Sequence, residues 1–255
     1  YRKSRGKTLK ANKFRIYFDN KQKIMFAKIF ACVRFIYNKM LSDKINYYHE
    51  TKQRLNNTPT QYKSEFGGGI MTIYLVRHGK DDETIRGRWS NHELMAVGVE
   101  QVNKLAKEIV AANMNIDYIY SSDLQRTKET SEILSKYLKC SIEYNAGLRE
   151  TNNGDLAGMK HELANEKYPG LYWSSLAYDE CYPNGESPKM FYNRVKTTWL
   201  ELKNRILKQP LKSSMIVIHQ GVIEVILCVE NSIAFSNKTK HFSVPNAQLI
   251  PIEVK

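Results

Sequence analysis

Short apolar runs alternate with amphipathic stretches along most of the chain. Two runs, Ile70–Val76 and Met215–Ile218, have the composition of buried strands, and shorter strand patterns occupy 117–120 and 142–144. Between them, residues 94–113 carry apolar side chains at helical spacing. These side chains are predicted to share one helical face: Val99, Val102, Leu105, Ala106, Ile109 and Val110.

Capping residues predict two further helices. Ser121–Asp123 supplies N-cap residues for a helix through Leu138, and Ser187 followed by Pro188 marks the start of another. The latter helix is expected to bury five apolar side chains: Phe191, Val195, Trp199, Leu202 and Ile206. The alternation of strands and helices predicts an α/β protein with three α/β/α layers and a largely parallel central sheet.

A histidine follows each of the two apolar runs, after one intervening arginine in the first case and directly in the second. His78 follows the first and precedes a glycine, and His219 follows the second with a glycine two positions later. Because the carboxyl ends of parallel strands open onto one edge of a sheet, the two imidazoles are expected to meet in one pocket. This convergence predicts an enzyme.

The residue types at the first strand end suit phosphoryl transfer. The guanidinium of Arg77 can bind phosphate oxygens bidentately, and a neutral His78 can accept and release a phosphoryl group. Gly79 is expected to let backbone N–H groups approach the ligand closely. Taken alone, the triplet favours the alternative of a strand-end histidine whose hydrogen bonds are structural.

Charge divides the chain into two parts. Residues 1–70 hold 16 of the 39 Lys and Arg and 4 of the 26 Asp and Glu, and so carry 12 of the 13 net positive charges. Residues 71–255 are nearly neutral. Such asymmetry predicts two units with different partners.

Three consecutive glycines predict a linker at 67–70, between an extension at 1–66 and a domain at 71–255. Because every glycine codon begins with GG, the run also resembles a translated ribosome-binding site ahead of Met71. We hypothesise that Met71 is the original start and that the preceding segment was joined later. A native species beginning at Met71, detected by mass spectrometry, would support this origin. Tyr1 indicates an incomplete or processed amino terminus.

Cysteine spacing and hydropathy bear on location. Four cysteines lie far apart with no CxxC pair: Cys32, Cys140, Cys181 and Cys228. This pattern favours reduced thiols in a cytoplasmic protein and predicts no metal site. The apolar stretch 24–37 contains Lys28 and Arg34, so no membrane span is predicted.

Five motifs follow one another in residues 71–255: Leu75–Gly79, Tyr120–Thr130, Leu148–Gly158, Asn184–Ser187 and Val217–Ile223. Together they resemble the histidine phosphatase superfamily in its phosphoglycerate mutase-like branch, over essentially all of this range. The resemblance implies the phosphoglycerate mutase-like α/β fold.

The resemblance also implies roles for five side chains. His78 matches the histidine that becomes transiently phosphorylated, and His219 matches the second histidine of the phosphate pocket. Arg77 and Arg126 match the phosphate-binding arginines, and Arg126 falls in the first helical turn, where the dipole favours an anion. Glu150 matches the general acid that protonates the leaving oxygen.

Physical chemistry supports the last role. A carboxyl group that faces a bound phosphate has its pKa raised by the like charge and can carry a proton near neutrality. The alternative for Glu150 is a surface ion pair with Arg149.

The chain departs from the family pattern at two positions. Thr84 stands where members often carry a phosphate-pocket asparagine, and Gln220 stands where a glycine usually follows the second histidine. Both are candidate substrate-binding residues, as is Arg86, and Trp89 and Asn91 occupy the same loop. For these loop residues, surface or packing roles explain the pattern at least as well.

The predicted reaction is hydrolysis. The segment between Glu150 and Asn184–Ser187 is short, whereas the glycolytic mutases that this core resembles carry longer insertions there. A pocket more open to water is expected to hydrolyse a phosphohistidine. The chain is therefore predicted to be a phosphomonoester hydrolase acting on a small phosphorylated metabolite, with phosphoglycerate mutase as the alternative. No cofactor is predicted, and the natural substrate and oligomeric state stay open.

The amino-terminal extension has its own resemblance. Residues 10–17 alternate as in a strand, 23–39 has a helical pattern, and with 57–66 they look like the amino-terminal part of OrfB-type (TnpB-type) transposases, often labelled helix-turn-helix. The nuclease core and zinc ribbon of that family are missing here, so no DNA cleavage is implied. A basic, mainly helical extension predicts nucleic-acid binding as a further alternative function. There are two competing interpretations. The extension is a remnant that lacks its partner surface, or its apolar stretch at 24–37 lies on an anionic membrane.

Overall fold

The computed structural model describes residues 41–52, 71–209 and 213–254. The chain divides into two units, Tyr1–Gly67 and Gly68–Lys255. In the first unit, residues 41–51 are helical. The strand predicted at 10–17, the helix predicted at 23–39 and the predicted glycine linker lie outside the described residues.

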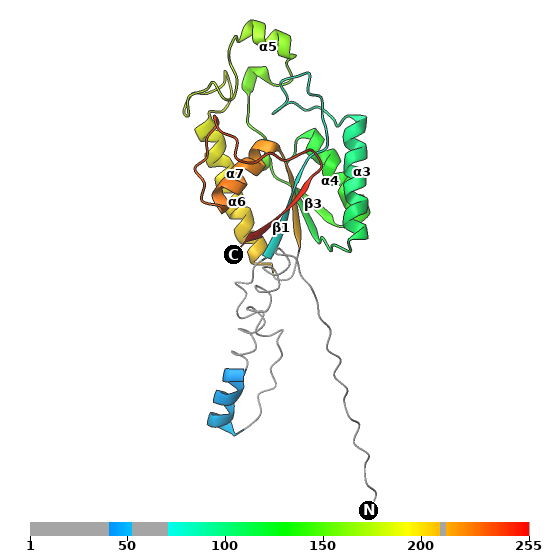
Figure 1. Cartoon of the computed structure of the whole chain (residues 1–255), viewed down its shortest axis with the longest axis vertical. Helices are drawn as coiled ribbons and strands as arrows, with labels where there is room; N and C mark the ends of the chain where they lie inside the picture. The colour runs from blue at the N-terminus through cyan, green and yellow to red at the C-terminus, as the bar shows by residue number, and fades with distance from the viewer. Residues whose placement is uncertain (1–40, 53–70, 210–212, 255) are drawn as a thin grey trace, which may run out of the picture. The chain divides into compact units, whose positions relative to one another are not determined.

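A five-stranded sheet forms the centre of the second unit, with the strand order β3-β2-β4-β1-β5 (Figure 1). The strands are β1 (Met71–Arg77), β2 (Tyr118–Ser121), β3 (Ser141–Tyr144), β4 (Ser214–Ile218) and β5 (Leu249–Val254). The first four pair in parallel, and β5 pairs antiparallel with β1. The prediction of a largely parallel sheet is confirmed, and the antiparallel edge strand is an addition that the patterns did not predict.

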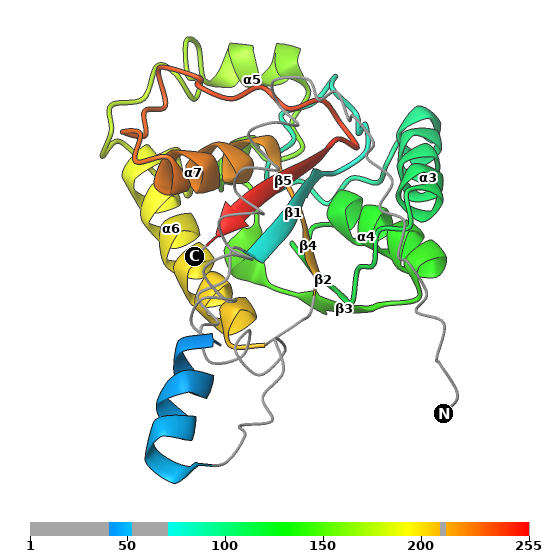
Figure 2. The same cartoon turned by 60° about the horizontal axis from the view of Figure 1, so that its bottom comes forward.

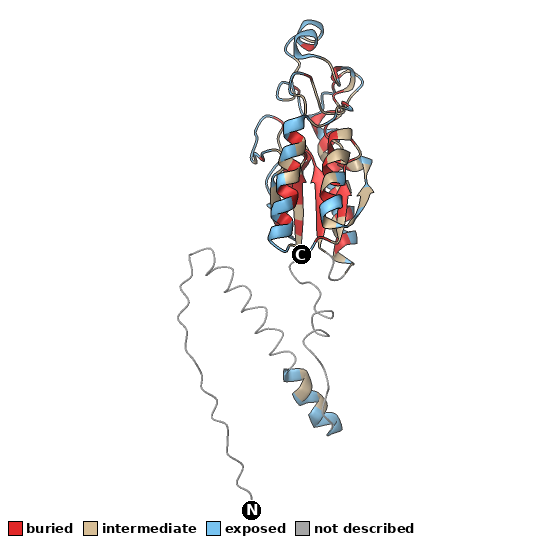
Figure 3. Cartoon of the chain, turned by 90° about the vertical axis from the view of Figure 1, so that its right-hand side faces the viewer, coloured by how far each residue is buried: buried red, intermediate tan, exposed pale blue. Residues whose placement is uncertain are grey.

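Helices cover both faces of this sheet, as Figure 2 shows. The helices of this unit are α3 (Ala96–Ala111), α4 (Gln125–Leu138), α5 (His161–Lys167), α6 (Pro188–Leu207) and α7 (Gln220–Glu230), with short 3-10 turns η1 (Ala146–Leu148) and η2 (Gly154–Leu156). α3 and α4 pack on one face of the sheet, and α6 and α7 pack on the other. Figure 3 shows the buried residues concentrated between these layers, which confirms the three-layer α/β/α fold.

Most of the helical side chains that were predicted to be buried are buried. All five apolar side chains predicted to be buried in α6 are buried. In α3, Val102, Leu105, Ala106 and Ile109 are buried, but Val110 is 49% exposed. Each helical residue turns the chain by about 100°, so the position after Ile109 already faces solvent.

The predicted helix starts have different outcomes. At α6 the prediction is confirmed, because the Ser187 side chain accepts a 3.1 Å hydrogen bond from the backbone N–H of Met190. At α4 it is wrong, because Leu124 is the N-cap and provides no side-chain hydrogen bond. Asp123 is occupied by another partner, and the Ser122 hydroxyl accepts from the N–H of Leu124 one step before the helix.

None of the helices in residues 41–52, 71–209 and 213–254 is long and apolar enough to cross a bilayer.

Candidate active site

Neighbouring strands bring the two strand-end histidines together. β1 and β4 pair in parallel with Arg77 opposite Ile218, so the next residue on each strand is a histidine. The ring centroids of His78 and His219 lie 5.1 Å apart, and both side chains are buried. The structure thus places two imidazoles side by side at the carboxyl edge of the sheet.

A backbone hydrogen bond orients the His78 ring. Its Nδ1 lies 2.7 Å from the carbonyl oxygen of Gly79, which can only accept, so Nδ1 carries the proton. The other nitrogen, Nε2, then has an unprotonated lone pair, as a nucleophile requires.

The structure gives a different reason for glycine at position 79 than the predicted one. A Cβ at this position would lie 2.6 Å from the carbonyl oxygen of Gly98 in α3. The backbone N–H of Gly79 donates to the Thr130 hydroxyl at 3.1 Å. Glycine is therefore required here because α3 packs closely against the strand end.

The second histidine is held from a third strand. The Nε2 atom of His219 lies 2.9 Å from the hydroxyl oxygen of Ser122, which follows β2. Its Nδ1 atom is buried and has no hydrogen-bond partner among the described residues. The ends of β1, β2 and β4 therefore all contribute to the same site.

Two arginines are fixed beside the histidines by backbone carbonyls. Arg126, in the first turn of α4, donates to the carbonyls of Ser90 at 3.1 Å and Arg88 at 2.5 Å, and is 2% exposed. Its Nε lies 3.3 Å from a carboxylate oxygen of Asp81. Arg77 donates from Nη1 to the carbonyl of Val244 at 2.7 Å. Both guanidiniums are thereby held before any ligand binds.

Several buried polar atoms in this cluster have no hydrogen-bond partner in the described part of the chain. They include Nε of Arg77, Nε of Arg126, Nδ1 of His219 and Oγ1 of Thr151. The Arg126 Nε contact with Asp81 is an ion pair without hydrogen-bond geometry. Buried polar groups are nearly always hydrogen-bonded, and leaving one unpaired costs about 1–3 kcal/mol. Together these groups suit a small anion with several oxygen acceptors.

The same environment keeps the histidines neutral. Burial lowers the pKa of His78 and of His219 well below the ordinary value of 6.5, and the positive charge of Arg126 lowers both further. A neutral His78 is available as a nucleophile at neutral pH.

Acid should therefore destabilise the ligand-free protein through these two groups. Below pH 6.5 the histidines of the unfolded chain bind protons, whereas those of the folded protein stay neutral. The free energy of unfolding should then fall with pH, by up to about 1.4 kcal/mol per pH unit for each histidine. Denaturant unfolding of wild type and His219→Asn between pH 7 and pH 5 measures this effect. A variant with a dependence as steep as that of wild type would contradict it.

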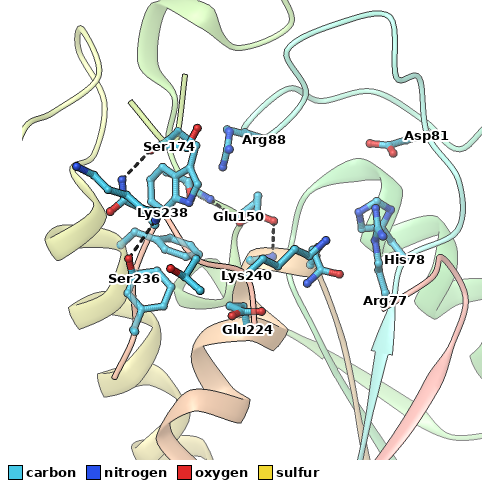
Figure 4. Close-up of a pocket in the computed structure, with 18 of the residues that line it drawn as sticks. Arg77, His78, Asp81, Arg88, Glu150, Ser174, Glu224, Ser236, Lys238 and Lys240 are labelled. Atoms are coloured by element: carbon cyan, nitrogen blue, oxygen red, sulfur yellow. Dashed lines mark hydrogen bonds between the residues drawn. The ribbon is translucent and has the colours of Figure 1, made fainter. Parts of the chain in front are cut away.

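Glu150 faces the same cavity from the loop after η1 (Figure 4). One carboxylate oxygen accepts from the backbone N–H of Gly221 at 2.9 Å, and the other accepts from that of Thr151 at 3.0 Å. Arg149 instead forms a bidentate ion pair with Asp123, at 2.6 and 2.5 Å. The alternative of a Glu150–Arg149 surface pair is therefore wrong.

The structure explains why position 221 keeps its glycine, whereas position 220 carries glutamine where the family usually has glycine. A Cβ at Gly221 would lie 2.3 Å from the nearer carboxylate oxygen of Glu150, so that position has no room for a side chain. Gln220 is tolerated because its amide turns away, donating to the Phe242 carbonyl at 2.8 Å and accepting from the Val244 N–H at 2.9 Å. Gln220 lines the cavity, but its amide group is engaged by the backbone.

Arg194 in α6 holds the loop that carries Glu150. Its five donor contacts go to both carboxylate oxygens of Glu186 and to the carbonyls of Gly147, Arg149 and Glu150, at 2.7 to 3.1 Å. Glu186 in turn accepts from the backbone N–H of Asn152 at 2.9 Å. No position in the sequence signals this arrangement.

Arg194→Lys should misplace Glu150 without removing it. A lysine cannot reproduce five directed donors, and a shift of about 1 Å in a catalytic group costs about 10²-fold in rate. We expect that loss in kcat/KM for an alkyl phosphate, with a much smaller loss for 4-nitrophenyl phosphate. Arg205→Lys, on the same helix in an exposed pair with Glu143, is the matched control. Equal losses for both substrates would assign Arg194 to general stability instead.

The remaining sequence candidates lie apart from this cluster. The Thr84 hydroxyl donates to Asp82 at 2.8 Å, and Arg86 donates to Asn165 at 2.8 Å and stacks on the Tyr172 ring. Neither is among the residues that line the cavity. Trp89 donates to the Glu150 carbonyl at 2.5 Å and thus supports the loop, and Asn91 is exposed.

The cavity extends from His78 to an aromatic wall. Its volume is about 510 Å³. The wall consists of Trp173, Phe191 and Phe235, and Arg88 lies with its guanidinium 5.0 Å from the Trp173 ring. Sequence reasoning missed Arg88 and Asp81 as cavity residues. A backbone φ of +54° at Arg88 is unusual for a non-glycine residue, and this conformation is invisible in the sequence.

Family models match both parts of the chain. A model described as "Histidine phosphatase superfamily (branch 1)" matches residues 73–255. A helix-turn-helix domain model of the OrfB type matches residues 8–53. Both predicted resemblances are thereby confirmed.

Curated relatives carry mutase names. A protein of Proteus mirabilis named "Probable phosphoglycerate mutase GpmB" is 29% identical over 160 residues, which are 60% of this chain and 71% of that protein. One of the same name from Salmonella choleraesuis is 32% identical over 132 residues, or 49% and 60% of the two chains. The match thus spans about three fifths of the Salmonella protein.

Solved structures share the fold at lower identity. A mycobacterial glucosyl-3-phosphoglycerate phosphatase superposes with a TM-score of 0.60 at 23% identity, covering 72% of this chain and 90% of that one. An alpha-ribazole phosphatase from Shigella flexneri superposes with a TM-score of 0.64 at 21% identity, covering 72% and 91%. At these identities the likeness establishes the fold alone.

Proposed function

We propose that this chain, which belongs to the histidine phosphatase superfamily, hydrolyses a small phosphomonoester through a phosphohistidine intermediate. The observation that supports this most directly is the group of buried, unpartnered donors beside His78. They are the Nε groups of Arg77 and Arg126. A phosphoryl group offers the several oxygen acceptors that they need.

In the first step, Nε2 of His78 attacks the phosphorus atom and a nitrogen–phosphorus bond forms. The bond between phosphorus and the ester oxygen breaks, and Glu150 gives its proton to that leaving oxygen. Arg77 and Arg126 stabilise the negative charge on the transferring group, because their donors are already in place. The alcohol then leaves.

In the second step, the Glu150 carboxylate takes a proton from a water molecule, whose oxygen attacks the phosphohistidine. The nitrogen–phosphorus bond breaks, inorganic phosphate is released, and His78 returns to its neutral form. Glu150 ends the cycle protonated, as it began. Glu150 thus acts first as acid and then as base, while His78 forms and loses the bond to phosphorus, and the enzyme consumes no protons over the cycle.

Two features favour hydrolysis over phosphoryl return to the product. The segment from Glu150 to Ser187 is short, and the site opens into a cavity of about 510 Å³, which leaves room for water beside the phosphate-binding arginines. The mutase names of the curated relatives make phosphoglycerate mutase the second candidate for the same site.

A direct assay separates these candidates. The protein should release inorganic phosphate from 4-nitrophenyl phosphate in the presence of EDTA. A screen of phosphorylated metabolites should include 3-phosphoglycerate and the phosphorylated nucleotide-loop precursor of cobalamin, with products followed by ³¹P NMR. Isomerisation of 3-phosphoglycerate without phosphate release would support the mutase instead.

We propose in addition that residues 1–66 form a separate nucleic-acid-binding unit, joined by the linker at 67–70 to the phosphatase domain at 71–255. The match of a helix-turn-helix model to residues 8–53 and the net charge of the segment support this. A salt-dependent shift of DNA mobility, lost when residues 1–70 are deleted, is the expected result. A shift that survives the deletion would contradict it.

A further inference from the structure

We propose that Glu224, Cys228 and His241 form a Zn²⁺-binding site beside the phosphate cavity. One potential ligand atom from each side chain lies within 4.8 Å of the other two. In the described ranges of the chain, this is the one place where three such ligands converge. The site uses none of the groups assigned to phosphoryl transfer.

The helix and a distant loop build the cluster together. Glu224 and Cys228 lie four residues apart in α7, so their side chains share one face of the helix. Both are buried, whereas His241 is exposed and comes from the chain before β5. An ion could therefore enter from the solvent side, past the imidazole.

Glu224 already fixes the loop in the position that such a site requires. Its two carboxylate oxygens accept from the backbone N–H groups of His241 at 2.7 Å and Phe242 at 3.0 Å. Gln220, one turn earlier in α7, holds the same loop through Phe242 and Val244. The His241 backbone is thus held over α7, and each Glu224 oxygen keeps a lone pair for a metal.

The donor set favours zinc. A thiolate, an imidazole and a carboxylate are the three ligand types that Zn²⁺ takes in proteins, and three protein ligands leave a fourth tetrahedral position for water. Within the described residues the Cys228 thiol has no hydrogen-bond partner. On binding, the sulfur–hydrogen bond gives its proton to solvent and a sulfur–zinc bond forms.

A bound ion would hold the segment before His241, which forms part of the cavity wall, in a fixed position. Lys238 and Lys240, just before His241, both line the cavity (Figure 4). A metal bound at His241 would tie that segment to α7.

The test uses the full chain after chelation and removal of metals. Titration with Co²⁺ should produce a thiolate-to-cobalt charge-transfer band that saturates at one equivalent per chain. Zn²⁺ should abolish the band by displacement. Cys228→Ser should eliminate the band, and His241→Ala should weaken Zn²⁺ binding by about tenfold or more, measured by competition with a chromophoric chelator.

Matched variants control for incidental binding and for misfolding. Cys181→Ser and His49→Ala remove an exposed thiol and an exposed imidazole elsewhere and should leave both readouts unchanged. His241 is exposed, so its replacement keeps the proposal testable even if Cys228→Ser fails to fold. Absence of the band in wild type, its survival in Cys228→Ser, or unchanged Zn²⁺ affinity in His241→Ala would overturn the proposal.

Discussion

His78→Ala is expected to lower kcat by about 10⁴-fold or more for every phosphomonoester that the protein hydrolyses. The substitution removes the only atom that we assign to attack on phosphorus, and loss of a nucleophile typically removes most of the catalytic effect. The phosphate-binding arginines keep their carbonyl partners in this variant. Substrate binding should therefore survive, and the loss should appear in kcat.

A trapping experiment makes the expectation specific to a covalent intermediate. Wild-type protein mixed with ³²P-labelled substrate and quenched in base should retain acid-labile label, as a phosphohistidine does, and His78→Ala should retain none. His161→Ala, which replaces an exposed histidine whose Nε2 contacts the Glu83 carbonyl, should behave as wild type. Turnover retained by His78→Ala would remove this residue from the nucleophile role.

The fold follows from local patterns wherever burial is continuous. β4 is buried at all five positions, and the α6 stripe is buried throughout, so their hydrophobic periods are clear in the sequence. The misplaced start of α4 shows the limit of such reasoning. Asp123 is a good capping residue in isolation, but its carboxylate binds Arg149, 26 positions away in the sequence. Tertiary ion pairing overrides the local preference there.

The site shows the same division between what a motif reveals and what only packing reveals. The strand-end rule places the two histidines correctly because it depends on chain direction alone. Arg88 and Arg194 carry no such signal. Arg88 reaches the cavity through a left-handed backbone conformation, and Arg194 meets the Glu150 loop from a helix more than 40 positions later. Gly79 and Gly221 are explained by the atoms they approach, in α3 and in Glu150 respectively.

Glu150→Gln is expected to lower kcat/KM for alkyl phosphates by about 10²–10⁴-fold, the usual contribution of a general acid. An alkoxide is a poor leaving group unless it is protonated as the ester bond breaks. 4-Nitrophenolate is a stable anion and leaves without that proton, so its kcat/KM should change less than about tenfold. The amide oxygen of glutamine can still accept from Gly221 or Thr151, which preserves the local fold.

The effects of Glu150→Gln on the two kinds of substrate should be compared through kcat/KM. That ratio reports the steps through departure of the alcohol, whereas kcat also includes attack of water on the phosphohistidine, for which Glu150 is the proposed base. Glu150→Gln should therefore release one rapid equivalent of 4-nitrophenolate and then turn over slowly. Glu143→Gln, at an exposed ion pair, supplies the control. Equal losses for both leaving groups would mean that Glu150 serves only to hold the α7 amino terminus, through its bond with Gly221.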